Sequence, residues 1–453
     1  MSKVRNIPAN GLQRVMLLWE NERPVNATHA YTFPANFPVS YEEFREVAVY
    51  ILSQACLAHV TATVDRLELR YSGATDEIPI ERIQYHGNIA EAFQGLACEQ
   101  LQTPFAKEGC PLRFVWLEPE VPGTQATGLL TCYRHAVADG ATVMQVLRQI
   151  LARAVGLPAQ TPLELFDGDL TRECRKLGLT AWSRFRSAAS ELWEFARCRA
   201  FPRPLQGQGR PIAMTHSQQI SVAAALLTAR SLGVTINDLV SSALMEGLMQ
   251  LFPGRSWNPM ATRIAIQCSV DLHVPLGLSP HVVGQLLGSY QLRCKHSSAA
   301  SFEQQTLWVG KESRRMKQHR TAVLQPHGMN LSFRSIQLLP QPMGLDLQKF
   351  CMPIWGGVSN IDARGLFMDL PANCQLMDCR RFTDVGELIP IYVAVTSVND
   401  RISLATTFRE GILSEREVHA LMNGICRRMN SHSDSRLQRQ HDRKEVISVT
   451  GIR

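Results

Sequence analysis

The fold of this 453-residue chain is decided by the stretch Leu129-Leu130-Thr131-Cys132-Tyr133-Arg134-His135-Ala136-Val137-Ala138-Asp139-Gly140. An apolar run rich in strand-forming residues leads into a lone histidine, and Asp-Gly follows three small residues later. From Ala141 to Val155 apolar residues recur at helical spacing, so the pattern predicts a strand, a tight loop and a helix. Asp139 or Gly140 would begin the helix, since Asp is a favourable N-cap and Gly tolerates unusual dihedrals.

This arrangement places His135 at the end of a strand, where the orientation of its ring can be fixed. A general base must be held within hydrogen-bond reach of the proton that it takes, and a strand end provides that rigidity. A histidine beside an apolar strand is also a common structural residue. The spacing alone leaves both interpretations open.

The segment Arg134-His135-Ala136-Val137-Ala138-Asp139-Gly140 resembles the HHxxxDG signature of the condensation-domain superfamily. That superfamily includes chloramphenicol acetyltransferase, the condensation domains of peptide synthetases, plant HxxxDG acyltransferases and polyketide-associated acyltransferases of the mycobacterial type. The chain is most similar in character to the last, stand-alone group. It differs from the signature at the first histidine, which is Arg134 here.

The residues around this segment extend the resemblance, because the elements expected before it occur in the order found in the superfamily. Ser40 and Glu43 form a capping-box pattern ahead of the first helix of this lobe. Thr103-Pro104-Phe105 resembles a TPF-like turn of the superfamily. The other predicted segments are strands at Asn26–Phe33, Val60–Val64, Arg66–Tyr71, Pro79–Tyr85 and Pro111–Leu117, and a helix at Ile89–Leu101.

The second half of the chain carries three further resemblances. Gly233–Val240 is similar to the VTxND helix entry, and Asp271-Leu272-His273 to the DLR exit, with His273 where arginine is usual. We expect His273 and His281 to be exposed loop residues. Ile354–Asn360 resembles the VSNxG strand, although Asp362 stands at the position of its glycine. We also predict a hairpin of Ile389–Thr396 and Ile402–Phe408 around Asn399-Asp400, and a helix over Ser414–Met429.

The positions of proline and glycine residues, which interrupt helices and strands, suggest the domain organisation. We expect an N-terminal lobe over 1–160, a helical connector over 161–210, a C-terminal lobe over 211–430 and a disordered tail over 431–453. Within the connector, Leu179–Phe201 is helical and amphipathic. It fits a crossover helix packed on one lobe, or a helix lying on a membrane surface, since arginines flank its aromatic residues.

The resemblance implies an α/β (α+β) fold of two chloramphenicol acetyltransferase-like lobes. Each lobe would be a mixed β-sheet with helices, and the two would form a V with a central tunnel. The implied activity is acyl transfer from a thioester of coenzyme A or of carrier-bound phosphopantetheine to a small-molecule hydroxyl or amine, in lipid or secondary-metabolite biosynthesis. His135 would be the general base. Two alternatives remain: a non-catalytic module that binds a carrier protein, and a stand-alone amide-forming condensation enzyme.

The resemblance also implies roles for the neighbouring residues. Asp139 would be structural and salt-bridged to an arginine, and Gly140 would let the helix approach the loop. Arg134 would either form a structural ion pair that folds outward or place its charge near an anionic substrate group. Ser359 and Asn360 are the candidates for stabilising the oxyanion, although a polar strand end often satisfies only its own backbone.

Composition limits the other classes of function. Twelve scattered cysteines without a CxxC pair indicate reduced thiols, neither a disulfide framework nor a zinc site. The formal net charge of +7 has no nucleic-acid recognition motif beside it, so we expect no nucleic-acid partner. No run of 18 apolar residues and no apolar signal core occurs, so we expect a cytoplasmic protein without a membrane span. We expect a monomer with no metal and no permanently bound cofactor.

Overall fold

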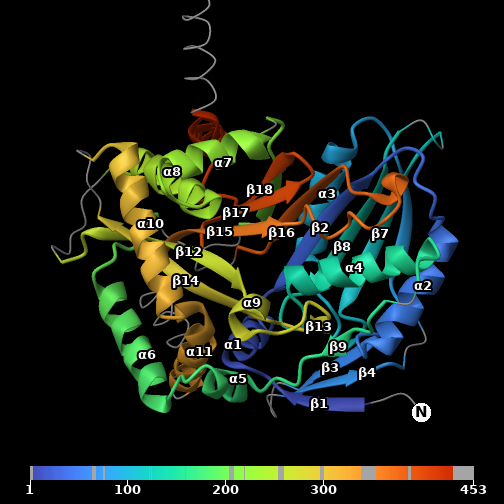
Figure 1. The fold of residues 1–453 in the computed structure, drawn as a ribbon, viewed down its shortest axis with the longest axis horizontal. Helices are drawn as coiled ribbons and strands as arrows, with labels where there is room; N and C mark the ends of the chain where they lie inside the picture. The colour runs from blue at the N-terminus through green and yellow to red at the C-terminus, as the bar shows by residue number, and fades with distance from the viewer. Residues whose placement is uncertain are drawn as a thin grey trace, which may run out of the picture.

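The computed structural model describes residues 4–431 except 64–67, 75–76, 122, 124, 159, 204–208, 219, 254–259, 296–299, 338–352 and 386–388. Its elements form two lobes, each built on a mixed sheet with helices packed against it (Figure 1). This is the predicted fold class. The predicted tail over 431–453 lies outside the described residues, apart from Ser431.

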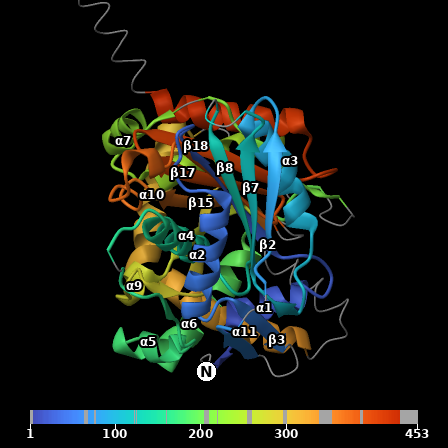
Figure 2. The same ribbon diagram turned by 90° about the vertical axis from the view of Figure 1, so that its right-hand side faces the viewer.

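The sheet of the first lobe has the strand order β16-β2-β8-β7-β5. Its inner strands are antiparallel, and β5 pairs with β7 in parallel. Figure 2 shows β2, β7 and β8 side by side, with α3 on one face and α2 and α4 on the other. The bounds are β2 Asn26–Phe33, β5 Ile80–Tyr85, β7 Leu112–Pro119, β8 Thr127–Arg134, β16 Asp378–Thr383, α2 Tyr41–Gln54, α3 Ile89–Gln102 and α4 Gly140–Ala154.

Alternation along β2 and β8 explains why this sheet carries helices on both faces. Tyr31 and Leu129 point into the core shared with α2 and α4, whereas Ala30 and Leu130 point toward α3. The predicted capping box forms at α2, where Ser40 Oγ accepts from the amide of Glu43 at 3.2 Å and the Glu43 carboxylate accepts from the Ser40 amide at 2.9 Å.

A smaller antiparallel sheet with the order β1-β4-β3-β6 lies below the main one. Helix α1 follows β1 and contacts a helix of the second lobe, α11. The bounds here are β1 Val4–Pro8, α1 Gly11–Trp19, β3 His59–Thr63, β4 Glu68–Ser72 and β6 Glu108–Gly109.

The second lobe is built on a sheet with the order β10-β18-β17-β15-β12-β14, with β11 also paired to β18. The hairpin of β17 and β18 turns at Asn399-Asp400, as predicted, and Asn399 adopts a positive φ of 52° there. The strands are β10 Pro211–Thr215, β11 Ile220–Ser221, β12 Arg263–Asp271, β14 Leu287–Lys295, β15 Ile354–Asp362, β17 Ile391–Val398 and β18 Arg401–Arg409. The helices are α7 Val222–Ser231, α8 Ile236–Leu251, α9 His273–Leu276, α10 Phe302–Gln318, α11 Thr321–Gln337 and one over 415–431.

The chain crosses between the lobes more than once. Strand β16 lies in the 211–430 half of the sequence but pairs with β2 of the first lobe, and Arg381 is the register partner of His29. The segment before it, which includes the short 3₁₀ helix Ala372–Cys374, packs into the core of the first lobe through Phe367, Leu370 and Cys374. A parallel pair of β9 (Glu164–Leu165) and β13 (Val282–Val283) makes a second link. The lobes therefore share structure around their junction.

Helices α5 (Leu170–Lys176) and α6 (Ala181–Ala196) occupy the connector between the two lobes. Helix α6 packs against α11. Among the described residues, no helix combines the length and the apolar character that crossing a membrane requires.

Candidate active site

His135 lies in the turn that joins β8 to α4. Its amide donates to the Val25 carbonyl at 3.0 Å, which extends the pairing of β2 and β8 by one residue. Directly after it, the amides of Val137 and Ala138 donate back to the Arg134 carbonyl, so the chain turns tightly toward α4. The strand, the loop and the helix thus follow one another as the sequence predicts.

The hydrogen bonding of the His135 ring defines which nitrogen carries the proton. Nδ1 lies 3.2 Å from the carbonyl oxygen of Ala138, which can only accept, so Nδ1 is the donor and Nε2 keeps its lone pair. Burial lowers the pKa of His135 below the ordinary value of 6.5, and the bond to Ala138 offsets part of that effect. The ring is therefore neutral at neutral pH, which is the form that a general base needs.

Two cavities meet at His135. The larger, about 230 Å³, lies between α4, β15, β16 and β17. The smaller, about 100 Å³, is lined by α1 and α11 on its other side, through residues such as Met16 and Met329. Both cavities are lined by His135, Ser269, Leu287, Thr383 and Tyr392. A reacting group at His135 is therefore accessible from two directions, which suits a reaction between two substrates.

Asp139 organises the turn through backbone hydrogen bonds. Its carboxylate accepts from the Thr142 amide at 2.8 Å, which caps α4, and from the Leu286 amide at 2.7 Å, across the lobe junction. Burial and the nearby charge of Asp271 raise the pKa of Asp139. The resemblance implies an arginine partner, but within the described part of the chain the ion pairs include none to Asp139. The backbone amides take that place.

Gly140 lies against a second buried histidine, His29 of β2. A Cβ atom at Gly140 would lie 3.2 Å from the His29 ring and equally close to Ile361, so only glycine fits without displacing them. The His29 ring is held by the hydroxyls of Tyr31 at 2.9 Å and Tyr133 at 3.1 Å. Burial, with smaller contributions from Arg381 and His135, holds the pKa of His29 well below its ordinary value, so the ring is neutral.

Arg134 takes no part in either cavity. Its guanidinium forms a buried ion pair with Glu20, in which Nη2 and Oε2 are 2.5 Å apart, and its Nε donates to the same carboxylate at 2.9 Å. The side chain points into the protein and not outward, because β8 ends beside the carboxylate that follows α1. Arg134 therefore does not contribute to the cavity walls that face His135.

Ser359 and Asn360, at the end of β15, both line the larger cavity. Arg381 donates to Ser359 Oγ at 2.9 Å and to the Ser359 carbonyl at 3.0 Å. Ser359 Oγ also forms a hydrogen bond with the hydroxyl of Tyr392, which lines the same cavity. Asn360 Oδ1 is buried without a hydrogen-bond partner among the described residues.

Sequence reasoning missed Arg381. It lies in a polar-apolar strand next to Arg380, and nothing in the pattern indicates which of the two points inward. In the structure it is 7 % exposed and lines the larger cavity. Its remaining bonds go to the Val395 carbonyl and Thr396 Oγ1, and no carboxylate of the described residues pairs with it. Burial lowers its pKa. Sequence reasoning also missed His29, because its position in an apolar strand does not indicate which residues surround it.

The prediction that His273 is exposed is wrong. It is 6 % exposed and begins α9, where Nδ1 lies 2.5 Å from Asp271 Oδ1 and Nε2 2.7 Å from the Val282 carbonyl. Both partners only accept hydrogen bonds, so the ring carries both protons. Burial alone would lower its pKa, but the bond to Asp271 and the charge of that residue outweigh it and raise the pKa to about 9. His281 is half-buried and not exposed, and its Nδ1 accepts from Gln145 Nε2 at 3.1 Å.

Comparison with known proteins identifies similar structures. No protein-family model matches the sequence, and no curated protein matches it. Among solved structures, the first condensation domain of the calcium-dependent antibiotic synthetase matches with a TM-score of 0.69 and 10 % identity, over 94 % of this chain and 96 % of that one. The condensation domain of the Monacolin K polyketide synthase MokA matches with a TM-score of 0.66 and 13 % identity, over 94 % and 97 % of the two chains.

A third match is the starter condensation domain of rhizomide synthetase RzmA in complex with C8-CoA and Leu-SNAC. Its TM-score is 0.66 at 12 % identity, over 94 % of both chains. At these identities the likeness establishes the fold and not the chemistry. It agrees with the two lobes described above. The chain therefore has the same two-lobe fold as these condensation domains.

Proposed function

We propose that this protein transfers an acyl group from a thioester to a hydroxyl or amine, with His135 as the general base. The observation that carries the proposal is the position of the His135 ring. It lies where two cavities meet, with Nδ1 bonded to Ala138 and Nε2 left as the base. The donor would enter through one cavity and the acceptor through the other.

His135 alone moves the proton in both steps of the proposed reaction, from the acceptor to the leaving thiolate. Nε2 takes the proton of the acceptor O–H or N–H as that atom attacks the thioester carbonyl carbon. The C–S bond of the tetrahedral intermediate then breaks, and the imidazolium gives its proton to the leaving thiolate. General base catalysis of this kind contributes about 10²–10⁴-fold, and holding both substrates in line supplies much of the remainder.

Ser359 is the better of the two candidates for stabilising the oxyanion. Its hydroxyl lines the larger cavity and is held there by Arg381 and Tyr392, whereas the buried Oδ1 atom of Asn360 has no partner among the described residues that would fix its amide group. Arg381 acts through Ser359 as a positioning residue. Asp139 holds the histidine turn, as its bonds to Thr142 and Leu286 indicate.

The similar structures support the choice of substrates. RzmA is described in complex with an acyl-coenzyme A and an aminoacyl thioester, so we infer thioester co-substrates here. Other neighbours come from polyketide and peptide synthetases, which favours a role in secondary-metabolite biosynthesis and a carrier-bound donor. We also propose that 1–160 and 211–430 correspond to the two lobes, with β16 exchanged between them.

The test is thiol release from a panel of acyl-coenzyme A and acyl-phosphopantetheine carrier donors, each with mixed alcohol and amine acceptors. Turnover that requires both a donor and an acceptor supports acyl transfer, and the acceptor that works separates ester from amide formation. An absence of turnover with free and carrier-bound donors alike contradicts the proposal. It would favour the alternative, a non-catalytic module that binds a carrier protein.

A further inference from the structure

Helix α6 exposes its apolar face and buries its acidic one. The exposed large side chains of this helix are Trp182 and Trp193, each 68 % exposed, Phe185 at 58 % and Leu192 at 52 %. Small residues fill the same face, and Arg186 is the charged member of it. In a surface helix that packs on a core, the apolar stripe normally faces inward. Here the pattern is inverted.

The acidic residues of α6 explain how the inverted helix is held. Glu191 pairs with Arg293, which is only 1 % exposed, and Glu194 pairs with Arg263 at 2.5 Å. Phe195 is the buried apolar residue on this inner side of the helix. The inner face of α6 is thus fixed by ion pairs to β12 and β14. The tryptophans are not needed for that attachment.

We propose that the exposed face of α6 binds the surface of an anionic phospholipid membrane. Tryptophan and phenylalanine favour the boundary between headgroups and acyl chains, where an interfacial helix buries its apolar face. The two rings of Trp182 and Phe185 stack at 5.7 Å between centroids, so they present one surface. At 16 residues, the helix is about 24 Å long, enough to lie along a membrane over several turns.

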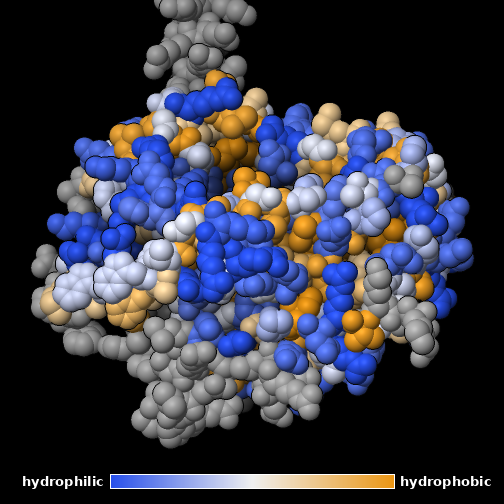
Figure 3. Space-filling model, turned by 60° about the horizontal axis from the view of Figure 1, so that its bottom comes forward, coloured by the Kyte–Doolittle hydropathy of each residue, from blue (hydrophilic) through white to orange (hydrophobic). Residues whose placement is uncertain are grey.

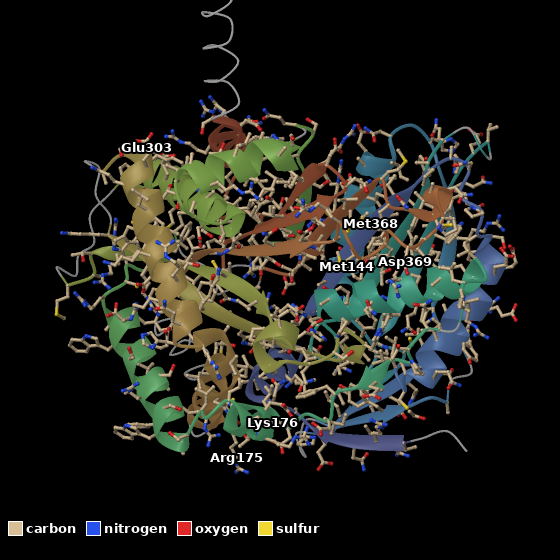
Figure 4. All side chains as sticks on the ribbon, in the orientation of Figure 1. Met144, Arg175, Lys176, Glu303, Met368 and Asp369 are labelled. Atoms are coloured by element: carbon tan, nitrogen blue, oxygen red, sulfur yellow. The ribbon has the colours of Figure 1, made fainter. Side chains whose placement is uncertain are left out.

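The charges beside this face match an anionic surface. Arg186 is exposed on the helix itself, and Arg175 and Lys176 are exposed on α5, next to the start of α6 (Figure 4). The glutamates of the helix turn inward, so the outer side carries basic groups. Figure 3 shows pale and orange side chains gathered at the left edge of the molecule, the side on which α6 lies in Figure 1.

A second copy of this chain fits the face less well. A symmetric contact between two α6 helices would bring Arg186 and the basic groups of α5 toward their own copies, and like charges at an interface oppose association. An anionic lipid surface has the opposite sign.

The neighbours of α6 connect this face to the reaction site. Helix α11 packs on α6 and also lines the smaller cavity through Gln325 and Met329. A membrane bound at α6 would therefore lie on the side of the molecule where that cavity is built. The proposal itself does not depend on the activity of His135.

The test is co-sedimentation of the full chain with vesicles of phosphatidylcholine alone and of an equimolar mixture with phosphatidylserine. We expect binding to the mixed vesicles that weakens with added salt. The double variant W182A/W193A should bind at least about tenfold less, since interfacial binding follows the apolar area buried. Met368→Ala is the matched control, because Met368 is also 68 % exposed but lies beside α4, away from α6 (Figure 4).

Circular dichroism confirms that each variant is folded. Failure of the native chain to bind either vesicle, or equal binding by the double variant, would overturn the proposal. Analytical ultracentrifugation adds a second decisive readout. A concentration-dependent dimer that the double variant abolishes, in a chain that ignores the vesicles, would assign the face to a second copy instead.

Discussion

The Nδ1 atom of His135 lies 3.2 Å from the carbonyl oxygen of Ala138, three residues along the same turn. This bond fixes the tautomer of the ring with a backbone group, so no carboxylate is needed to orient it. The same turn is capped by Asp139, whose carboxylate accepts from backbone amides on both sides of the lobe junction. The geometry that we propose for catalysis thus depends on the local path of the chain.

The pH profile of the reaction follows from the burial of His135. Its pKa is lowered below the ordinary value of 6.5, and the base works only when it is neutral. We expect kcat/KM to rise with pH through that lowered pKa, so the midpoint of the rise should lie below pH 6.5. A kcat/KM that still rises steeply above pH 7, with the profile of one titrating group, would contradict the assignment of His135 as the base.

Ser359→Ala should reduce kcat more than Asn360→Ala does. Removing one oxyanion donor typically costs about 10²–10³ in kcat, and the bonds from Arg381 and Tyr392 hold Ser359 Oγ in the wall of the larger cavity, where it would be that donor. Steady-state kinetics of the two variants makes the comparison, with KM little changed in each. A larger loss in Asn360→Ala would give the role to the asparagine.

Gly140→Ala should destabilise the fold, although alanine is normally the better helix residue. The added methyl would lie 3.2 Å from the His29 ring, which two tyrosine hydroxyls hold in place, and overpacking of this kind costs about 1–3 kcal/mol. Gly95→Ala is the control, because Gly95 is exposed within α3 with nothing within 4 Å of the added atom. Thermal unfolding should show a lower Tm for the first and a higher Tm for the second.

His273 should make stability depend on pH on the alkaline side. Its folded pKa of about 9 exceeds the unfolded value near 6.5, so the stabilisation is fully present below pH 6.5 and is lost as pH rises through 9. We expect a loss of roughly 1–3 kcal/mol over that window by chemical denaturation. His273→Arg keeps the charge throughout, so in that variant the dependence should flatten. A native chain equally stable at pH 6 and pH 9.5 would refute the assignment.

Local pattern was sufficient to predict much of the fold. The strand predicted over 26–33 has the same bounds as β2, because apolar and polar residues partly alternate in this segment and Pro34 ends it. The capping box of Ser40 and the hairpin at Asn399-Asp400 are set by residues close in sequence. Each of these elements depends on neighbours a few positions away, which a single sequence displays.

The features that were missed depend on tertiary contacts. Helix α11 contains Pro326, and Gly328 follows shortly after, a combination that argues against a helix, so no element was predicted there. Nothing local indicates that β16 pairs with β2, more than 300 positions earlier in the chain. The burial of His273 and the inward position of Arg381 likewise depend on contacts with Val282 and Ser359, which lie farther away in the sequence.

The most direct measurement of the central claim is the kcat/KM of His135→Ala, with the donor and acceptor that the native chain turns over. His86→Ala, at an exposed histidine on the surface, is the matched control. We predict a loss of about 10²–10⁴-fold in the first variant, with the circular dichroism spectrum retained, and none in the second. Turnover by folded His135→Ala at the native rate would contradict the account.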